Sequence, residues 1–257
     1  MFPPPDWQAP WYEPWREHGE RVLERIAQGL PLHDALNGAA SPVRFVAASQ
    51  LPPGQAYEQF VFERGACPTR ANLHDFFNGL CWLALPRAKR RMNGLHAGQI
   101  RRAGSVGAVR GPLRDALTIL DENGAVLAAP PALWQALLAR DWRRLFVDLR
   151  PLWGQARLTI VGHALLEQLV RPRKGLTAHV LALPAPLAAM PALDAWLAGE
   201  LEAPRLAAKP FTPLPVLGVP GWWAGNQNFS FYDDSFVFRA PGSNKPKTTA
   251  PPAAWRP

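Results

Sequence analysis

Cysteine is scarce in this chain of 257 residues, which contains only Cys67 and Cys81. Two thiols in a chain of this length do not make a disulfide framework and are typical of the reducing cytosol. No apolar run approaches the ~20 residues that a membrane-spanning helix requires. The first residues also lack the basic and apolar regions of a secretory signal. We therefore expect a soluble, cytoplasmic protein with no membrane partner.

The motifs of several common enzyme classes are also absent. The chain has no GxxxxGK[ST] loop, no GxGxxG after a strand, no GxSxG turn, no CxxC pair and no HExxH. These absences weigh against kinase-like, dinucleotide-dependent, serine-hydrolase and zinc-ribbon functions. Neither cysteine lies in a recognisable nucleophile motif.

Acidic residues are missing between Pro86 and Arg114, where the basic residues equal in number the net charge of +8 of the whole chain. A basic cluster of this kind attracts phosphates or nucleic acid, although the solvated face of a helix has the same composition. The residues expected to contact a phosphate-containing small molecule or a nucleic acid are Arg87, Arg90, Arg91, Arg101 and Arg102.

Hydrophobic residues make up 48% of the chain, enough for a substantial core. Short strands and helices alternate irregularly, which favours an α+β fold in a single globular domain over a doubly wound parallel sheet. We expect a Pro/Trp-rich arm at 1–14, the domain at 15–239 and a disordered tail at 240–257.

Local patterns predict individual elements. Strands are expected at 44–48, 59–62, 145–149, 158–161 and 177–183, and a hairpin at 116–128 with its Asn-Gly turn at 123–124. Helices are expected at 14–28, 73–85, 86–93, 131–139, 162–170 and 185–201. The segment 104–111 is glycine-rich and is expected to be flexible.

The most informative stretch sets His74, Asp75 and Asn78 into an almost wholly apolar helix. Burying such groups without partners costs several kcal/mol, so they must have hydrogen-bond partners or take part in a functional site. An imidazole beside a carboxylate and an amide suits acid–base chemistry or metal ligation. The same pattern also fits a hydrogen-bonded core histidine, with Asp75 in a capping-box-like arrangement with Asn72.

Further polar groups follow at helical spacing. Lys89, Asn93 and His96 share one face of the next helix, and the charged pair Arg114-Asp115 enters an apolar segment. The candidate catalytic residues are therefore His74, Asp75, Asn78, Lys89, Asn93, Arg114 and Asp115.

His163 and Glu167 lie four residues apart at a strand-to-helix junction, so both side chains point to one helix face. Together with His74 they would offer the mixed nitrogen and oxygen ligands that Zn²⁺ or Mn²⁺ accepts. The alternative is that Glu167 pairs with Arg171 one turn later and that His163 packs under the turn. The candidate metal ligands are thus His74, His163 and Glu167, provided that they converge.

Several segments together resemble the bacterial family of unknown function DUF3025, over about residues 40–240. The segments that carry the resemblance are Tyr57-Glu58, His74–Asn78, Pro86 with Lys89 and Asn93, Arg114-Asp115, Thr118, Asp121-Glu122, Gly162–Leu165 with Glu167, Gly218–Trp222, and Phe231–Asp234 with Phe238-Arg239. The resemblance implies a small soluble bacterial protein and no particular reaction.

Three functions remain open at this point, and the sequence leaves undecided whether the protein is an enzyme. The leading hypothesis is a cleft around the His74–Asn78 helix that performs metal-assisted hydrolysis of a phosphate-containing substrate, with Lys89 or Arg114 holding the phosphate. The alternatives are a non-catalytic protein that binds nucleic acid or another polyanion, and a structural or partner-interaction protein.

Overall fold

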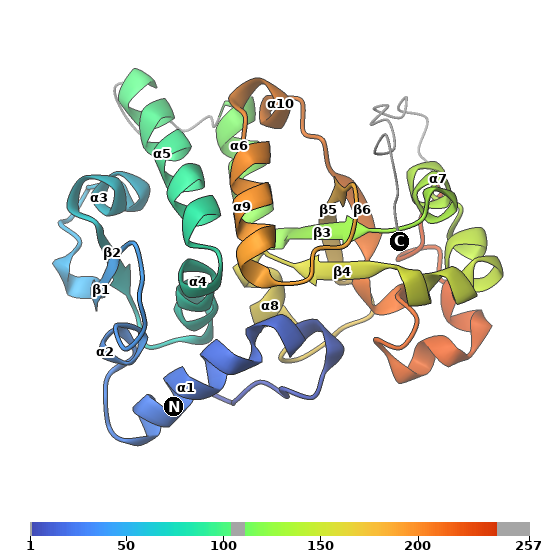
Figure 1. The fold of residues 1–257 in the computed structure, drawn as a ribbon, viewed down its shortest axis with the longest axis horizontal. Helices are drawn as coiled ribbons and strands as arrows, with labels where there is room; N and C mark the ends of the chain where they lie inside the picture. Colours follow the sequence, from blue (N-terminus) through green and yellow to red (C-terminus); the bar gives the residue numbers. More distant parts are fainter. Residues whose placement is uncertain (1, 104–110, 241–257) are drawn as a thin grey trace. The chain divides into compact units, whose positions relative to one another are not determined.

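A computed structural model describes residues 2–103 and 111–240. The predicted α+β class is confirmed, with one sheet of two strands and one of four (Figure 1). The chain forms two compact units. The described part of unit 1 is 2–5, 12–103, 111–121 and 187–209, and that of unit 2 is 6–11, 122–186 and 210–240. The predicted domain limits stay predictions, and the segment 104–110 and the tail 241–257 lie outside the described residues.

Unit 1 is mainly helical. Its helices are α1 (Arg16–Ala27), α2 (Leu32–Leu36), α3 (Tyr57–Arg64), α4 (Leu73–Ala84), α5 (Pro86–Ala103), α6 (Pro112–Asn123, up to Asp121), α9 (Met190–Glu200) and α10 (Ala203–Ala207). The strands β1 (Arg44–Ala47) and β2 (Ala66–Thr69) pair in parallel, and α3 lies in their connection. The side chain of Asn37 ties α2 to β1, because it donates to the carbonyl oxygen of Phe45 and accepts from its amide.

Helix α4 forms the buried centre of unit 1. It begins after Asn72, whose Oδ1 accepts a hydrogen bond from the Asp75 amide at 2.8 Å, so the predicted cap is confirmed. Every residue from Asp75 to Ala84 is buried, and Phe77 stacks on Tyr12 with ring centroids 5.6 Å apart. This burial explains why the helix is apolar almost all round.

Helix α5 begins at Pro86, a favoured first helical residue because its missing amide would have no partner there. The carboxylate of Asp194 on α9 accepts from the amides of Arg87 and Ala88 at 3.1 and 2.8 Å. An anion at a helix N-terminus is stabilised by the free amides and the helix dipole. Thus α9 supplies the cap for a helix that has no acidic residue of its own.

Unit 2 is built around a four-stranded sheet in the order β4-β3-β5-β6. The strands are β3 (Gly124–Ala128), β4 (Arg157–Ile160), β5 (Thr177–Leu183) and β6 (Thr212–Pro215), and the α-helices are α7 (Pro131–Ala139) and α8 (His163–Gln168). β3 is buried along its whole length and pairs in parallel with β5 and antiparallel to β4. Beside the strands, Phe146 stacks on Trp153 and Tyr232 with ring centroids 5.7 and 5.2 Å apart.

Three strand predictions were wrong. The residues 59–62 belong to α3, in which the side chain of Gln59 donates a hydrogen bond to Glu63 one turn later. The residues 145–149 fall largely in the helical turn Arg144–Asp148. The residues 116–120 belong to α6 and not to a hairpin strand. Short apolar runs fit a buried helix as well as a strand, and the Asn-Gly pair here joins α6 to β3. Helix α5 also continues past Asn93 to Ala103.

In the described part of the chain, no helix is both long and apolar enough to span a membrane.

A backbone feature of unit 2 predicts a stabilising substitution. Arg140 follows α7 in the left-handed backbone conformation, with φ 52° and ψ 34°. This conformation is unfavourable for residues other than glycine. Arg140→Gly should raise the free energy of unfolding by about 0.5–1 kcal/mol, measured by urea denaturation. The control Arg143→Gly, at the right-handed φ of −63°, should lower it instead. Destabilisation by both substitutions would contradict this explanation.

Candidate functional site

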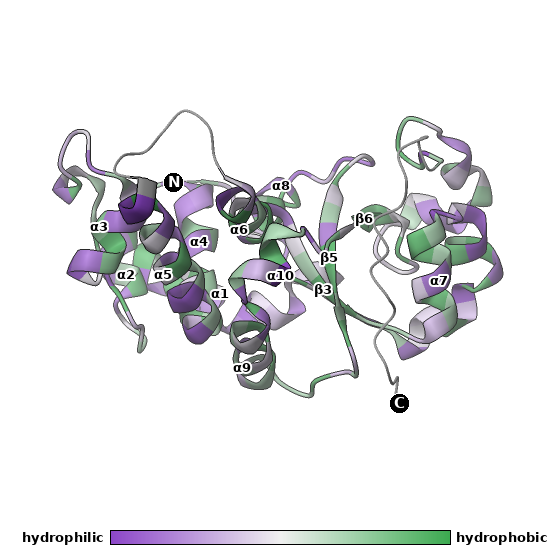
Figure 2. Ribbon diagram, turned by 90° about the horizontal axis from the view of Figure 1, so that it is seen from above, coloured by the Kyte–Doolittle hydropathy of each residue, from purple (hydrophilic) through white to green (hydrophobic). Residues whose placement is uncertain are grey.

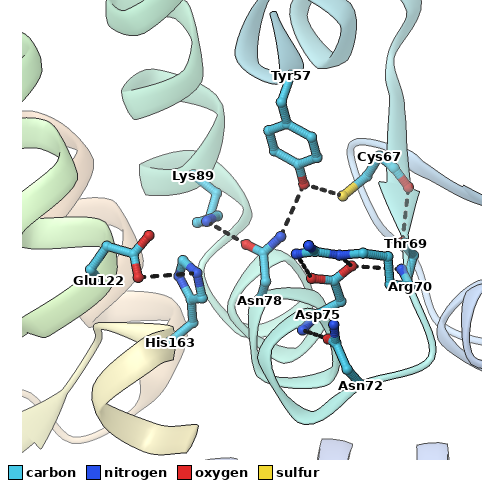
Figure 3. A network of polar contacts seen from close by, with 10 residues as sticks. All are labelled: Tyr57, Cys67, Thr69, Arg70, Asn72, Asp75, Asn78, Lys89, Glu122 and His163. Atoms are coloured by element: carbon cyan, nitrogen blue, oxygen red, sulfur yellow. Dashed lines mark hydrogen bonds and ion pairs between the residues drawn. The ribbon is translucent and has the colours of Figure 1, made fainter. Parts of the chain in front are cut away.

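A buried lysine joins three helices of unit 1. Lys89 on α5 is 5% exposed, and its Nζ donates to Asn78 Oδ1 on α4 at 2.8 Å and to Asp121 Oδ1 on α6 at 2.6 Å (Figure 3 draws the bond to Asn78). The ammonium also lies 5.4 Å from the centroid of the Trp82 ring. Burial is the largest single influence and acts to lower the pKa of Lys89, but the Asp121 carboxylate and the nearby Cys81 and Cys67 together raise that pKa above its usual value. Lys89 is therefore a charged group that already has its counter-ion.

The polar chain continues from Asn78 into the small sheet. Asn78 Nδ2 donates to the Tyr57 hydroxyl at 3.0 Å, and this hydroxyl lies 3.0 Å from Cys67 Sγ (Figure 3). Burial raises the pKa of the Tyr57 phenol, and it raises the thiol pKa to about 11 for Cys67 and about 12 for Cys81. Both cysteines are thus protonated near neutral pH, which makes them poor nucleophiles.

Asp75 is held by neighbouring residues. Its Oδ2 accepts from the amide of Arg70 at 2.6 Å and from Arg70 Nε at 3.0 Å, while Oδ1 accepts from Nη2 at 2.8 Å (Figure 3). These bonds fix the turn between β2 and α4. The geometry supports a structural part for Asp75, and its catalytic role stays a prediction.

The face of α5 that carries Lys89 also carries Asn93 and His96, as their spacing predicts. Asn93 Nδ2 donates to the carbonyl oxygen of Glu58 at 2.7 Å. His96 is 7% exposed, and its Nδ1 is buried with no hydrogen-bond partner in the part of the chain that the structure describes. Burial lowers the pKa of this imidazole.

Arg114 on α6 is also 7% exposed, and its Nε is buried without a hydrogen-bond partner in residues 2–103 and 111–240. Among the described residues no carboxylate forms an ion pair with it. The positive charges of Arg114 and Lys89 act to lower the pKa of His96, whereas the carboxylates of Glu58 and Asp121 act to raise it. These groups therefore lie within electrostatic range of the same imidazole. We call Lys89, His96, Arg114 and Asp121 the Arg114 cluster.

Asp115, the sequence neighbour of Arg114, does not neutralise it. The Asp115 carboxylate forms an ion pair with Lys209, which follows α10. The two members of the predicted pair thus have different surroundings, and a catalytic role for Asp115 stays a prediction.

The predicted metal ligands are divided between the units. In unit 2, His163 Nε2 lies 3.8 Å from Glu122 Oε2 (Figure 3), and Glu167 lies one turn further along α8. A Cβ atom on Gly162 would lie 2.5 Å from the carbonyl oxygen of Glu122, so only glycine lets α8 start this close to the end of α6. His74 belongs to unit 1, and its convergence with His163 stays a prediction.

The outer surface of α5 is basic. Figure 2 shows hydrophilic residues along this helix. The five arginines predicted to contact phosphates are all exposed, namely Arg87, Arg90, Arg91, Arg101 and Arg102. Two of them make contacts within unit 1, because Arg91 Nε donates to the carbonyl oxygen of Leu201 at 3.1 Å and Arg101 lies over the Phe62 ring at 4.8 Å.

Comparison with known proteins places the chain in one family. Residues 43–241 match the family described as "Protein of unknown function (DUF3025)". The chain belongs to this family. No curated protein and no solved structure matches it. The predicted resemblance to DUF3025 is thereby confirmed. The description of this family names no activity.

Two members of this site are absent from the candidate residues that the sequence indicates. The predicted hairpin places Asp121 next to its turn, and Tyr57 enters only through the family resemblance. The signal for Asp121 was present, because Leu113, Leu117 and Leu120 repeat at helical spacing and place Arg114 and Asp121 seven residues apart on one helix face. The contact of Tyr57 with Asn78 is tertiary and has no local signal.

The ion pair of Lys89 can be measured directly. Lys89→Met should lower the free energy of unfolding by about 2 kcal/mol or more, because it leaves Asp121 and Asn78 without their donor. A double-mutant cycle with Asp121→Asn should give a coupling energy of about 1 kcal/mol or more in urea denaturation. The control Arg90→Met removes an exposed cation from the same helix and should change stability by less than about 0.5 kcal/mol. A coupling energy near zero would show that the pair contributes nothing.

Proposed function

We propose that this DUF3025 protein binds an anionic small molecule at the Arg114 cluster. The observation that carries the proposal is the guanidinium of Arg114, which is more than nine-tenths buried and forms no ion pair among the described residues. A buried charge without a counter-ion costs several kcal/mol, so natural proteins keep one where something compensates it.

The neighbouring carboxylates support this reading. Asp121 forms an ion pair with Lys89, and Asp115 forms one with Lys209. Each of these acidic side chains of α6 therefore already has a cationic partner. Among the described residues Arg114 thus keeps a positive charge without an ion-pair partner, which a bound anion would supply.

The chemistry of the donors also suits an anion. Arg114 Nε and His96 Nδ1 are both buried nitrogens without hydrogen-bond partners among the described residues, and both can donate N–H groups to oxygen. Arginine forms strong, directional hydrogen bonds with carboxylate and phosphate oxygens. Binding an anion would satisfy both nitrogens and the uncompensated charge in one step.

Calorimetric titration with inorganic phosphate tests this function. The wild-type protein should bind phosphate, and Arg114→Met should abolish binding without lowering the melting temperature, because the substitution removes a buried charge that has no partner. Arg114→Lys, which keeps the charge but loses the planar fork, should weaken binding at least tenfold. The control Arg101→Met should leave binding unchanged. Unaltered phosphate binding by Arg114→Met would overturn the proposal.

The exposed face of α5 favours polyanion binding as a second candidate function. All five predicted arginines are exposed on a helix without acidic residues. Affinity for single-stranded DNA should then fall with salt by about 0.7 log unit per log unit of salt for each phosphate contacted.

Exchange of the five arginines for glutamine should remove most of this affinity, measured by fluorescence anisotropy. The matched control exchanges an equal number of exposed arginines elsewhere, namely Arg21, Arg44, Arg64, Arg143 and Arg144. Equal losses in both variants would mean that only the net charge matters and would exclude a specific face on α5.

A further inference from the structure

We infer that Glu122 and His163 of unit 2 bind a divalent transition-metal ion, such as Zn²⁺, where the end of α6 meets the start of α8. The inference concerns a different unit from the Arg114 cluster and does not rest on the proposed function. It also differs from the sequence prediction, because Glu122 takes the place expected for Glu167.

The distance between the two side chains fits a shared metal ion. His163 Nε2 lies 3.8 Å from Glu122 Oε2 (Figure 3), which is longer than the hydrogen bonds of about 2.7–3.2 Å that proteins form. Zinc binds histidine nitrogen and carboxylate oxygen at about 2.0–2.2 Å, so two ligand atoms of one tetrahedral ion lie about 3.4 Å apart. A small rotation of the Glu122 side chain would therefore let one ion bind both atoms.

The backbone holds the two residues close together. The amides of Val161 and Gly162 both donate to the carbonyl oxygen of Gly124 at 2.9 Å, so the chain that enters α8 is fixed to the start of β3. A Cβ atom on Gly162 would lie 2.5 Å from the carbonyl oxygen of Glu122, and His163 is the next residue. The pair thus stands on a rigid junction, which is what a precise binding site requires.

The charge and the ligand chemistry of this junction favour a cation. The C-terminus of α6 and the N-terminus of α8 carry opposite partial charges of about half an elementary charge, so their effects largely cancel. The carboxylate of Glu122 therefore sets the sign of the local charge. Imidazole nitrogen and carboxylate oxygen form a ligand set that Zn²⁺ and Mn²⁺ accept. The remaining positions of the ion would be taken by water or other groups, since the Glu122 side chain is 35% exposed.

A second histidine–carboxylate pair shows that distance alone does not define the site. His33 Nε2 also lies 3.8 Å from Asp34 Oδ1, but these residues are neighbours in the sequence and their side chains are 26% and 52% exposed. The side chain of His163 is 5% exposed, and its carboxylate partner comes from another element. Buried side chains on two fixed elements are held in place, whereas exposed ones sample several rotamers. The pair at 33–34 is therefore a matched control.

Zn²⁺ is the best probe, because a site of nitrogen and oxygen ligands binds it more tightly than Mn²⁺. In calorimetric titration of the metal-free protein with zinc chloride, Glu122→Gln and His163→Gln should each weaken binding at least tenfold. Glu122→Gln keeps the shape of the side chain, so its melting temperature without metal should stay close to that of the wild type. The controls His33→Gln and Glu167→Gln should leave the affinity unchanged.

A crystal structure of the zinc-loaded protein locates the ion by anomalous scattering. The ion should lie within about 2.0–2.2 Å of both His163 Nε2 and Glu122 Oε2. Zinc binding of wild-type affinity in Glu122→Gln would overturn the inference, as would binding that Glu167→Gln abolishes and Glu122→Gln retains. Zinc found only at the exposed pair of residues 33–34 would overturn it as well. None of these outcomes affects phosphate binding at Arg114, so the proposed function is tested separately.

Discussion

The ion pair between Lys89 and Asp121 is the interaction on which the site in unit 1 depends. It joins α5 to α6, and the bond from Lys89 to Asn78 extends the connection to α4. Because the Lys89 ammonium donates hydrogen bonds to Asp121 and Asn78, this buried lysine has both a counter-ion and hydrogen-bond partners. The same bonds remove Asp121 as a counter-ion for Arg114, which lies seven residues earlier on α6. A structural pair thus leaves the neighbouring arginine uncompensated, and this makes the cluster suited to an external anion.

Buried polar groups in unit 1 fall into two kinds. Asp75 and Asn78 each have partners within unit 1 that explain why they are buried, and the raised thiol pKa of Cys67, about 11, makes it an inert member of the same chain of contacts. Arg114 and His96 are buried to the same degree, but each retains a nitrogen that has no hydrogen-bond partner within the described segments. The hydrogen bonds of Asp75 and Asn78 stabilise the fold, since an unsatisfied buried polar group costs free energy. The unpartnered nitrogens of Arg114 and His96 lower the stability of the fold, and a bound anion would offset this loss.

Local chemistry made much of unit 1 predictable. The cap at Asn72, the helix after it and the shared face of Lys89, Asn93 and His96 follow from spacing and capping preferences alone. The error at 116–123 arose because an Asn-Gly pair that commonly makes a hairpin turn here joins a helix to a strand. That error concealed Asp121, and with it the reason why Lys89 is satisfied and Arg114 is not. Which of two buried cations has a counter-ion is a tertiary property that no periodicity reveals. The expected metal site of His74, His163 and Glu167 stays a prediction for the same reason.

The most direct test of this account is a crystal structure of the protein with selenate, whose position anomalous scattering identifies. We expect selenate oxygens within hydrogen-bond distance, about 2.7–3.2 Å, of Arg114 Nε and His96 Nδ1. Selenate found only on the exposed arginines of α5, with Arg114 Nε bonded to a protein carbonyl or carboxylate, would contradict it.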